Sequence, residues 1–599
     1  MNGILTAIKL LGGLAMFLYG MEVMGDGLKR GSGEALKRFL GQLTHSTILG
    51  VITGAVVTAI VQSSTAIIVL TVGLIGAGIL NLRQAVSIVM GANIGTTITA
   101  QIIRLMDLET SGNPLLVFFK PDALAPIALT VGIILFMFVS RGGAKNTGSI
   151  CLGIGILFSG LLAMMGAVAP MADSPAFHHV MAYFSNMPVM GILVGLAATV
   201  LIQSSAAMVG ILQALSSTGA MDFSMIYPMI MGINLGTCVT TAMVCSIGSS
   251  KDAKRTGVVH IAFNTIGTVV FMLAMTVVRG MGMFPDLWNS TVDSGAIANF
   301  QTMFNLVTAA MLIPFTGALM KLSYTIVKED PEEEDRYPEL SALDRKLLVS
   351  PAVALSQATR SLAVMAKAAK ENTQRGLAQF VSYDAKRAEE IARCEERLDT
   401  FADAADNFLI ELFPRLENER DNRQLNMVMQ CVPSIERIGD YATNFDEMAK
   451  KLADAELSFS ESAQKELDIL SAAVEDILDL TVQALTEDDE DVARRIEPLE
   501  ETIDDMVLLL RDRHAARLRQ GVCQMDSGLV FIDTLTYLER AADQCSSIAM
   551  LMLGRNDEEI MKNHHRYLQE LHSSGSGSYL EEQEMRRQQY LVPLEQIAL

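Results

Sequence analysis

The sequence predicts an all-α protein in which a multi-pass membrane domain of two inverted repeats is followed by a second, helical domain. Three observations carry this prediction. Several apolar runs approach the roughly 20 residues that a spanning helix needs. A polar motif inside the apolar part occurs twice, which indicates an internal duplication with broken helices or re-entrant hairpins. The last part of the chain is acidic and shows helical periodicity.

Charge and hydropathy divide the chain into two unlike parts. Residues 1–328 hold 16 Lys and Arg against 11 Asp and Glu, whereas the remaining residues hold 30 against 56. The first part contains the long apolar runs, which are Gly3–Val23, Ala125–Ser140, Ile150–Ala169, Met190–Leu215, Val258–Val278 and Asn305–Leu322. One or two such runs fit a buried core, but six predict a membrane domain over residues 1–327 that lies in a lipid bilayer.

Composition also excludes several classes of function. The acidic balance and the low aromatic content argue against nucleic acid as a partner. The seven cysteines are scattered without a C-x-x-C pair, so we expect reduced thiols and neither disulfides nor a zinc site. No phosphate-binding P-loop and no nucleophile elbow occurs. The sequence therefore predicts that the protein is not an enzyme.

The duplication is visible without gaps. Segment 51–97 aligns with segment 192–238, so that IVQSST and GANIGTT in the first copy answer to LIQSSA and GINLGTC in the second, 141 positions later. Upstream glycines match with a shift of 140. The spacing predicts a first repeat over about residues 5–145 and a second over about residues 146–325.

Charged loops predict that the two copies point in opposite directions. Residues 29–38 of the first copy hold four Lys or Arg, and the equivalent residues 170–181 of the second copy hold none. After the second motif the bias is reversed, because residues 251–255 hold three Lys or Arg. Short cytoplasmic loops are rich in these residues. Inverted repeats are typical of secondary transporters, whose binding sites lie where the repeats meet.

The polar motifs need a reason to lie within apolar sequence. Polar groups at membrane depth are tolerated when they are buried in protein or line a wet cavity. One copy alone would fit hydrogen bonding between packed helices, but two copies at one spacing favour a ligand site. The glycines that flank Asn93 and Asn234 predict helix breaks. Free N–H groups at such breaks hold anions, and carbonyl and hydroxyl oxygens hold sodium.

These residues resemble a known family. The doubled Q-S-S motif with GANIGTT and GINLGTC is similar to the type II sodium/phosphate cotransporters in their bacterial form, over about residues 5–325. The resemblance implies that the two Q-S-S segments face each other and bind inorganic phosphate, with co-transported sodium ions close by. The implied phosphate-binding residues are Gln62, Ser63, Ser64, Thr65, Gln203, Ser204 and Ser205. Candidates for sodium binding or support are Asn93, Thr96, Thr97, Asn234 and Thr237.

The second copy departs from the first at two positions. Ala206 stands where the first copy has Thr65, and Cys238 stands where it has Thr97, so the second copy offers fewer hydroxyl groups. The family's His-x-x-Phe-Asn pattern occurs at His260. A lone histidine usually packs or forms a hydrogen bond, so His260 is left outside the predicted site.

The acidic part begins after a charged linker over residues 328–342. Residues 343–571 have the apolar spacing of a helical domain, and the remaining residues 572–599 form a flexible linker and a tail. For the tail, an amphipathic docking segment and a solvated chain are both compatible with the sequence.

Carboxylates recur in this helical domain with the spacing E-x-x-x-D, which places two of them on one helix face. Salt bridges to Arg437 and Arg540 would be a purely structural explanation. The motifs are also similar to PhoU-like regulators, two three-helix bundles whose acidic clusters bind metal. That resemblance implies divalent or iron ions at Glu395, Asp399, Glu436, Asp440, Glu500, Asp504, Glu539 and Asp543.

Together these features predict a sodium-coupled secondary transporter of inorganic phosphate in the plasma (inner) membrane, with a cytoplasmic PhoU-like regulatory domain. Two alternatives stay open: a membrane-anchored phosphate sensor, and a carrier or exporter of another oxyanion.

Overall fold

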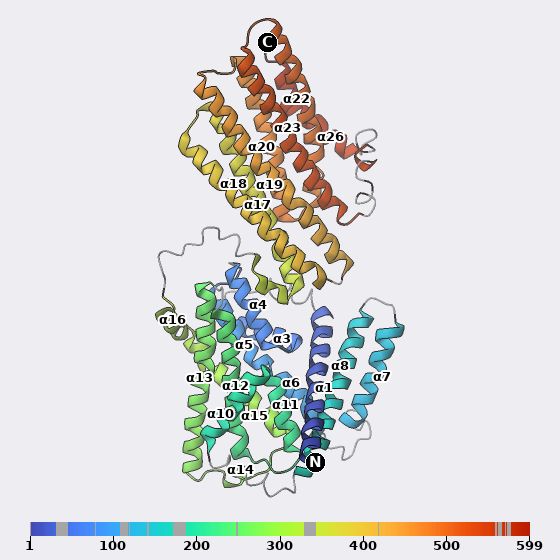
Figure 1. Cartoon of the computed structure of the whole chain (residues 1–599), viewed down its shortest axis with the longest axis vertical. Helices are drawn as coiled ribbons and strands as arrows, with labels where there is room; N and C mark the ends of the chain where they lie inside the picture. Colours follow the sequence, from blue (N-terminus) through green and yellow to red (C-terminus); the bar gives the residue numbers. More distant parts are fainter. Residues whose placement is uncertain are drawn as a thin grey trace. The chain divides into compact units, whose positions relative to one another are not determined.

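The computed structural model is all-helical over the residues that it describes (Figure 1). The chain forms two compact units, Met1–Glu334 and Asp335–Leu599. The described residues are 2–31, 46–77, 79–107, 118, 120–139, 143–171, 187–246, 250–328, 343–416, 418–557, 560, 563, 566–569, 571 and 577–598. Most of the charged loops that predicted the orientation of the repeats, and residues 329–342 of the predicted linker, lie outside these ranges.

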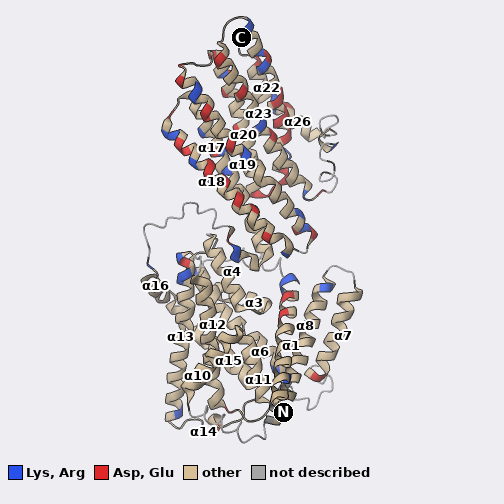
Figure 2. Cartoon of the chain, viewed as in Figure 1, with Lys and Arg blue, Asp and Glu red and all other residues tan. Residues whose placement is uncertain are grey.

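The first unit is built from apolar helices with few charged side chains (Figure 2). Its helices are α1 (Asn2–Gly31), α3 (Thr47–Val61), α4 (Ser64–Gly76), α5 (Leu82–Gly95), α6 (Thr97–Ile103), α7 (Pro121–Phe138), α8 (Ala144–Val168), α10 (Pro188–Ile202), α11 (Ser205–Ser216), α12 (Phe223–Ser246), α13 (Lys251–Gly280), α14 (Pro285–Trp288), α15 (Ser294–Leu312) and α16 (Thr316–Ile326).

Within the described ranges, seven helical segments of this unit are long and apolar enough to cross a membrane. They are Ile4–Gly31, Leu82–Ile103, Pro121–Phe138, Ala144–Val168, Phe223–Ser246, Lys251–Gly280 and Ser294–Ile326. The unit is therefore a multi-pass membrane domain. Helices α3, α4, α10 and α11 are apolar but have only 15, 13, 15 and 12 residues, shorter than the roughly 20 that a spanning helix needs.

Of the helix breaks predicted at the Asn-x-Gly-Thr segments, the one at Asn234 is wrong, and the one at Asn93 is only a one-residue interruption at Thr96. Helix α12 runs unbroken through Asn234, and Thr96 between α5 and α6 keeps a right-handed helical backbone. The glycines permit close helix packing instead. A Cβ atom on Gly91 of α5 would lie 2.0 Å from the carbonyl oxygen of α3 residue Val51, and one on Gly232 of α12 would lie 2.1 Å from an oxygen of α10. The helices are interrupted at the glutamines of the Q-S-S motifs, where α3 and α10 end.

Helices α1 and α8, which carry matching glycines of the two repeats, pack along their length (Figure 1). A Cβ atom on Gly13 would lie 2.8 Å from the backbone nitrogen of Met164. One on Gly20, further along α1, would lie 2.3 Å from the backbone nitrogen of Leu157, earlier in α8. The contacts advance in opposite directions along the sequence, so the two helices are antiparallel.

The second unit contains two three-helix bundles. In the first, α17 (Pro351–Val381), α18 (Ala385–Leu412) and α19 (Glu419–Asp454) pack on one another; in the second, α20 (Glu461–Glu487), α22 (Ile496–Arg519) and α23 (Met525–Gly554) do so, and α21 (Glu490–Ala493) joins α20 to α22. Helices α19 and α23 contact each other and join the bundles. Each helix buries apolar residues three and four apart, as amphipathic helices do.

The C-terminal tail docks on the second bundle. Helix α26 (Gly577–Arg586), a π-helical turn and α27 (Val592–Glu595) follow one another, and α26 packs on α22 (Figure 1). Leu594 is fully buried, and Arg587 pairs with Asp505 of α22. Of the two alternatives for the tail, the docking segment is the one found in residues 577–598.

The α1–α8 contact yields a prediction. Gly20→Ala places a methyl group where the backbone of α8 now lies, so the helices must separate at a cost of about 1–3 kcal/mol. We expect a lower melting temperature for the detergent-solubilised chain. Gly12→Ala on the same helix is the matched control, because its Cβ atom would meet nothing within 4 Å. Equal melting temperatures for the two variants would contradict this packing.

Candidate anion and cation sites

The two Q-S-S motifs form the same backbone break. Gln62 ends α3 and Gln203 ends α10, each in the left-handed region at φ 58° and ψ 21°. Their N–H groups bond the carbonyl oxygens of Thr58 (2.8 Å) and Thr199 (2.7 Å). A left-handed backbone costs a non-glycine residue about 1–2 kcal/mol. Residues held in such conformations cluster at functional sites.

A second helix starts directly after each break. Ser63 and Ser204 are extended and cap α4 and α11, their Oγ atoms accepting the N–H groups of Ala66 (3.2 Å) and Ala207 (3.1 Å). The first N–H groups of a helix have no acceptor within it. In α4 these belong to Ser64 and Thr65, and in α11 to Ser205 and Ala206. Each motif therefore presents N–H groups together with hydroxyl groups, a donor set suited to an anion.

The two glutamine side chains differ. Gln62 accepts the Oγ1–H of Thr99 at 2.6 Å and donates to the carbonyl oxygen of Ala59, whereas the side chain of Gln203 is exposed. Sequence reasoning missed Thr99. The repeat contained a signal for it, because Thr240 lies 141 positions further on. Thr240 bonds the carbonyl oxygen of Thr237 in its own helix (2.8 Å).

Each Q-S-S helix packs on a helix of the other copy that contains or directly follows its Asn-x-Gly-Thr segment. Helix α4 contacts α12, and α11 contacts α6. Helix α1 contacts the first break and also a helix of the second copy. A Cβ atom on Gly25 would lie 3.8 Å from the Cβ of Gln62, and one on Gly210, well inside α11, would lie 2.5 Å from the ring of Phe17. The fold thus interleaves the two copies around their motifs.

The candidate sodium residues are mostly bonded to their own helices. The hydroxyls of Thr96, Thr97 and Thr237 donate to carbonyl oxygens three or four residues earlier, at 2.9, 2.8 and 2.6 Å. Asn234 likewise donates to its own helix. Asn93 is different, because its Oδ1 lies 3.2 Å from Nε2 of His260 on α13. The histidine left outside the predicted site therefore hydrogen bonds a residue inside it.

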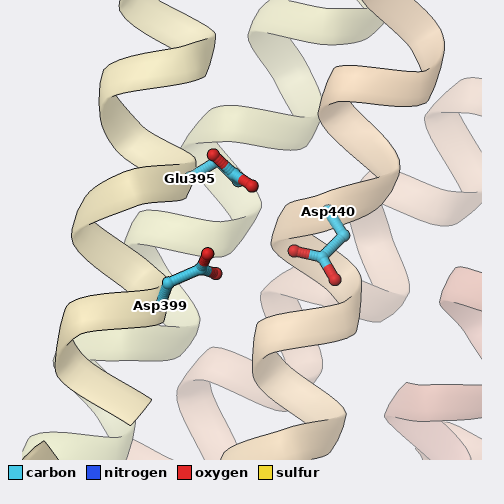
Figure 3. Close-up of side chains that lie close together, drawn as sticks. All are labelled: Glu395, Asp399 and Asp440. Carbon is cyan, nitrogen blue, oxygen red and sulfur yellow. The ribbon is translucent and has the colours of Figure 1, made fainter. Parts of the chain in front are cut away.

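In the first bundle, three predicted carboxylates meet. Glu395 and Asp399 project from α18 toward Asp440 on α19 (Figure 3), and each offers an oxygen within 4.8 Å of the others. Burial and the neighbouring carboxylates raise the pKa of Glu395 and of Asp440. Repulsion of this kind favours a bound cation or a proton.

The second bundle repeats the arrangement with Glu500, Asp504 and Asp543, whose oxygens also lie within 4.8 Å of one another. Burial, followed by the Asp543 and Glu539 charges, raises the pKa of Asp504 to about 7, and burial with adjacent carboxylates raises the pKa of Glu500 strongly.

The fourth predicted carboxylate of each bundle lies outside these groups. Glu539 accepts a hydrogen bond from Arg511 at 2.6 Å, and Glu436 is not among the three clustered oxygens. Among the described ion pairs, none joins Arg437 or Arg540 to a clustered carboxylate. Three carboxylate oxygens at this spacing suit a hard cation such as a divalent or ferric ion.

Two family models match the chain. The model described as "Na+/Pi-cotransporter" matches residues 16–167 and again residues 162–313, which covers both repeats. The model described as "PhoU domain" matches residues 362–449 and 467–552, which lie in the two bundles. No solved structure matches the chain.

The relatives agree with the family models. A protein of Escherichia coli K12 named "Putative inorganic phosphate export protein YjbB" is 23% identical over 562 residues, 93% of this chain and 99% of that protein. "Uncharacterized protein YqeW" of Bacillus subtilis is 26% identical over 52% of this chain and 96% of its own length. The human "Sodium-dependent phosphate transport protein 2B" is 33% identical over 109 residues, 18% of this chain and 16% of that protein. This chain belongs to the Na+/Pi-cotransporter family and carries a PhoU domain.

Proposed function

We propose that this protein is a secondary transporter that carries inorganic phosphate together with sodium across the plasma (inner) membrane, and that its PhoU domain is cytoplasmic and regulates it. The observation that carries the proposal is the pair of matching left-handed breaks at Gln62 and Gln203, each followed by a helix start. Left-handed residues cluster at functional sites, so two matching ones within apolar sequence favour a ligand site.

The chemistry of the motifs supports an oxyanion. Each motif offers backbone N–H, hydroxyl and amide donors. No charged side chain occurs among the proposed phosphate-binding residues, which are Gln62, Ser63, Ser64 and Thr65 in the first motif and Gln203, Ser204 and Ser205 in the second. An anion held by neutral donors at membrane depth gains much from cations bound alongside it. Hydroxyl and amide oxygens near Asn93 and Asn234 are hard ligands that suit sodium.

Two observations support inverted repeats. The glycine contacts of α1 and α8 show that these equivalent helices run antiparallel, and the Lys and Arg bias of the loops is reversed between copies. In an inverted pair the two Q-S-S segments approach the bilayer midplane from opposite sides, which suits alternating access.

Export is the second candidate. The Escherichia coli relative, which matches over 99% of its own length, is named "Putative inorganic phosphate export protein YjbB", whereas the match to the human sodium-dependent transporter covers 109 residues. An exporter would release phosphate without being driven by inward sodium.

Flux in proteoliposomes separates the two candidates. With external phosphate and an inward sodium gradient, we expect phosphate to accumulate against its own gradient, because sodium entry drives symport. The same gradient made with potassium is the control. Phosphate that only runs down its gradient, at a rate independent of sodium, contradicts symport and supports export.

The glutamine side chains can be tested apart from the backbone break. Glycine adopts the left-handed region at little cost, so Gln62→Gly and Gln203→Gly keep the break and remove the amide. A hydrogen bond to a charged group contributes about 1.5–3 kcal/mol, so we expect each variant to raise the half-saturating phosphate concentration about 10- to 150-fold.

The control for the glutamine variants is Phe284→Gly, which changes an exposed left-handed residue outside the motifs. It should transport phosphate normally. Unchanged phosphate dependence in the double glutamine variant would show that the amides do not contact the substrate.

For the regulatory domain, we propose that the two carboxylate clusters each hold a divalent or iron ion. Titration of the purified full chain with manganese(II), followed by the electron paramagnetic resonance signal of the free ion, should show two bound ions. Asp440→Asn and Asp504→Asn should each weaken one site at least about ten-fold. Protons compete for the same oxygens, so binding should be tighter at pH 8 than at pH 6.

Asp403→Asn, which changes an exposed carboxylate one turn beyond Asp399 on α18, is the matched control and should leave both ions bound. If the folded chain binds no manganese, the proposal is wrong and the clusters are only solvated acidic groups.

A further inference from the structure

The crossing of α13 and α15 buries oxygen atoms that lie outside the Q-S-S and Asn-x-Gly-Thr motifs. Asn264 on α13 donates its Nδ2–H to the carbonyl oxygen of His260 (3.1 Å), and Asn305 on α15 donates in the same way to that of Gln301 (3.0 Å). The two amides are thus oriented by the same contact. Both Oδ1 atoms are buried without a hydrogen-bond partner in the described part of the chain.

Two threonine hydroxyls beside these amides are also unusual. Thr256 and Thr276 on α13 donate to the carbonyl oxygen four residues earlier, as helical threonines commonly do. Thr268 on α13 and Thr308 on α15 are 5% and 0% exposed, yet their Oγ1 atoms have no partner among the described residues. These two hydroxyls are therefore free to bind something other than their own helices.

The register of the crossing brings these residues together. A Cβ atom on Gly267 would lie 2.6 Å from Cγ2 and 2.9 Å from Oγ1 of Thr308, and the ring centroids of Phe271 and Phe304 lie 4.9 Å apart. Residues three and four apart share a helix face. The four oxygen-bearing residues therefore lie on the two surfaces that face each other at this crossing.

The chemistry of the four oxygens limits what can bind them. Burying an unpaired polar group is unfavourable, and more so away from water. All four are neutral, whereas a divalent ion is usually held with carboxylates and a proton needs an ionisable group. Neutral hydroxyl and amide oxygens suit a hard monovalent cation.

We propose that the α13–α15 crossing binds a monovalent cation of the sodium class, through the hydroxyl oxygens of Thr268 and Thr308 with the amide oxygens of Asn264 and Asn305 on either side. This inference rests on the sodium coupling proposed above. It assigns the cation to residues other than those of the Asn-x-Gly-Thr segments, whose threonine hydroxyls bond their own helices.

Equilibrium binding of radioactive sodium to the purified full chain, without phosphate and with choline as the replacing cation, tests the site directly. The double variant Thr268→Val/Thr308→Val removes both hydroxyls and keeps the side-chain shape. We expect it to raise the half-saturating sodium concentration at least ten-fold, or to lower the number of bound ions by one. Thr276→Val, which removes a hydroxyl bonded within α13, should bind sodium as the unmodified chain does.

A folding defect is distinguished by the melting temperature without sodium. The removed hydroxyls have no partner among the described residues. The melting temperature of the double variant should therefore equal or exceed that of the unmodified chain. Sodium binding that is unchanged in the double variant would mean that the crossing holds only water, and overturns the proposal.

Phosphate flux separates this inference from the proposed function. Sodium-driven uptake that is equally sensitive to sodium in the double variant overturns the cation site and leaves the transporter intact. Uptake by the unmodified chain that ignores sodium overturns the coupling itself, and the cation site with it.

Discussion

Where a helix is interrupted inside an apolar domain, the backbone N–H and C=O groups at the interruption need other hydrogen-bond partners. In the membrane unit this constraint is met twice by the same local solution. A left-handed glutamine returns its N–H to a threonine carbonyl, and the following serine caps the next helix. The flanking helices are too short to span a bilayer alone, so they depend on glycine-lined contacts with longer neighbours, as α10 does with α12.

The scaffold is nearly symmetric but its chemistry is not. Both breaks have the same backbone angles, yet Gln62 is held by Thr99 while Gln203 is exposed. Asn93 reaches His260 on another helix, while Asn234 bonds its own. The duplicated frame supplies two equivalent positions, and the surrounding side chains give these positions different hydrogen-bond partners.

The PhoU domain contains carboxylates that are paired with arginine side chains and carboxylates that are not. Glu466 is fully buried and accepts 2.6 Å hydrogen bonds from Arg513 and Arg517, so its charge is compensated. The clusters around Asp440 and Asp504 have no comparable partner among the described ion pairs, and burial and mutual repulsion raise the pKa of both residues. The same physics that stabilises the first arrangement makes the clusters favourable positions for an ion from solution.

The sequence by itself determined the helical class, the duplication, the family and the paired carboxylates, because these follow from residue identity and spacing along one chain. It misplaced the helix breaks, since a glycine serves a turn and a close helix contact equally well. Only the tertiary structure decided that Gly91 faces the backbone of α3, and that Gln62 and Asn93 bond residues 37 and 167 positions away. Such pairs depend on which helix faces pack together, and that choice is made by the whole domain.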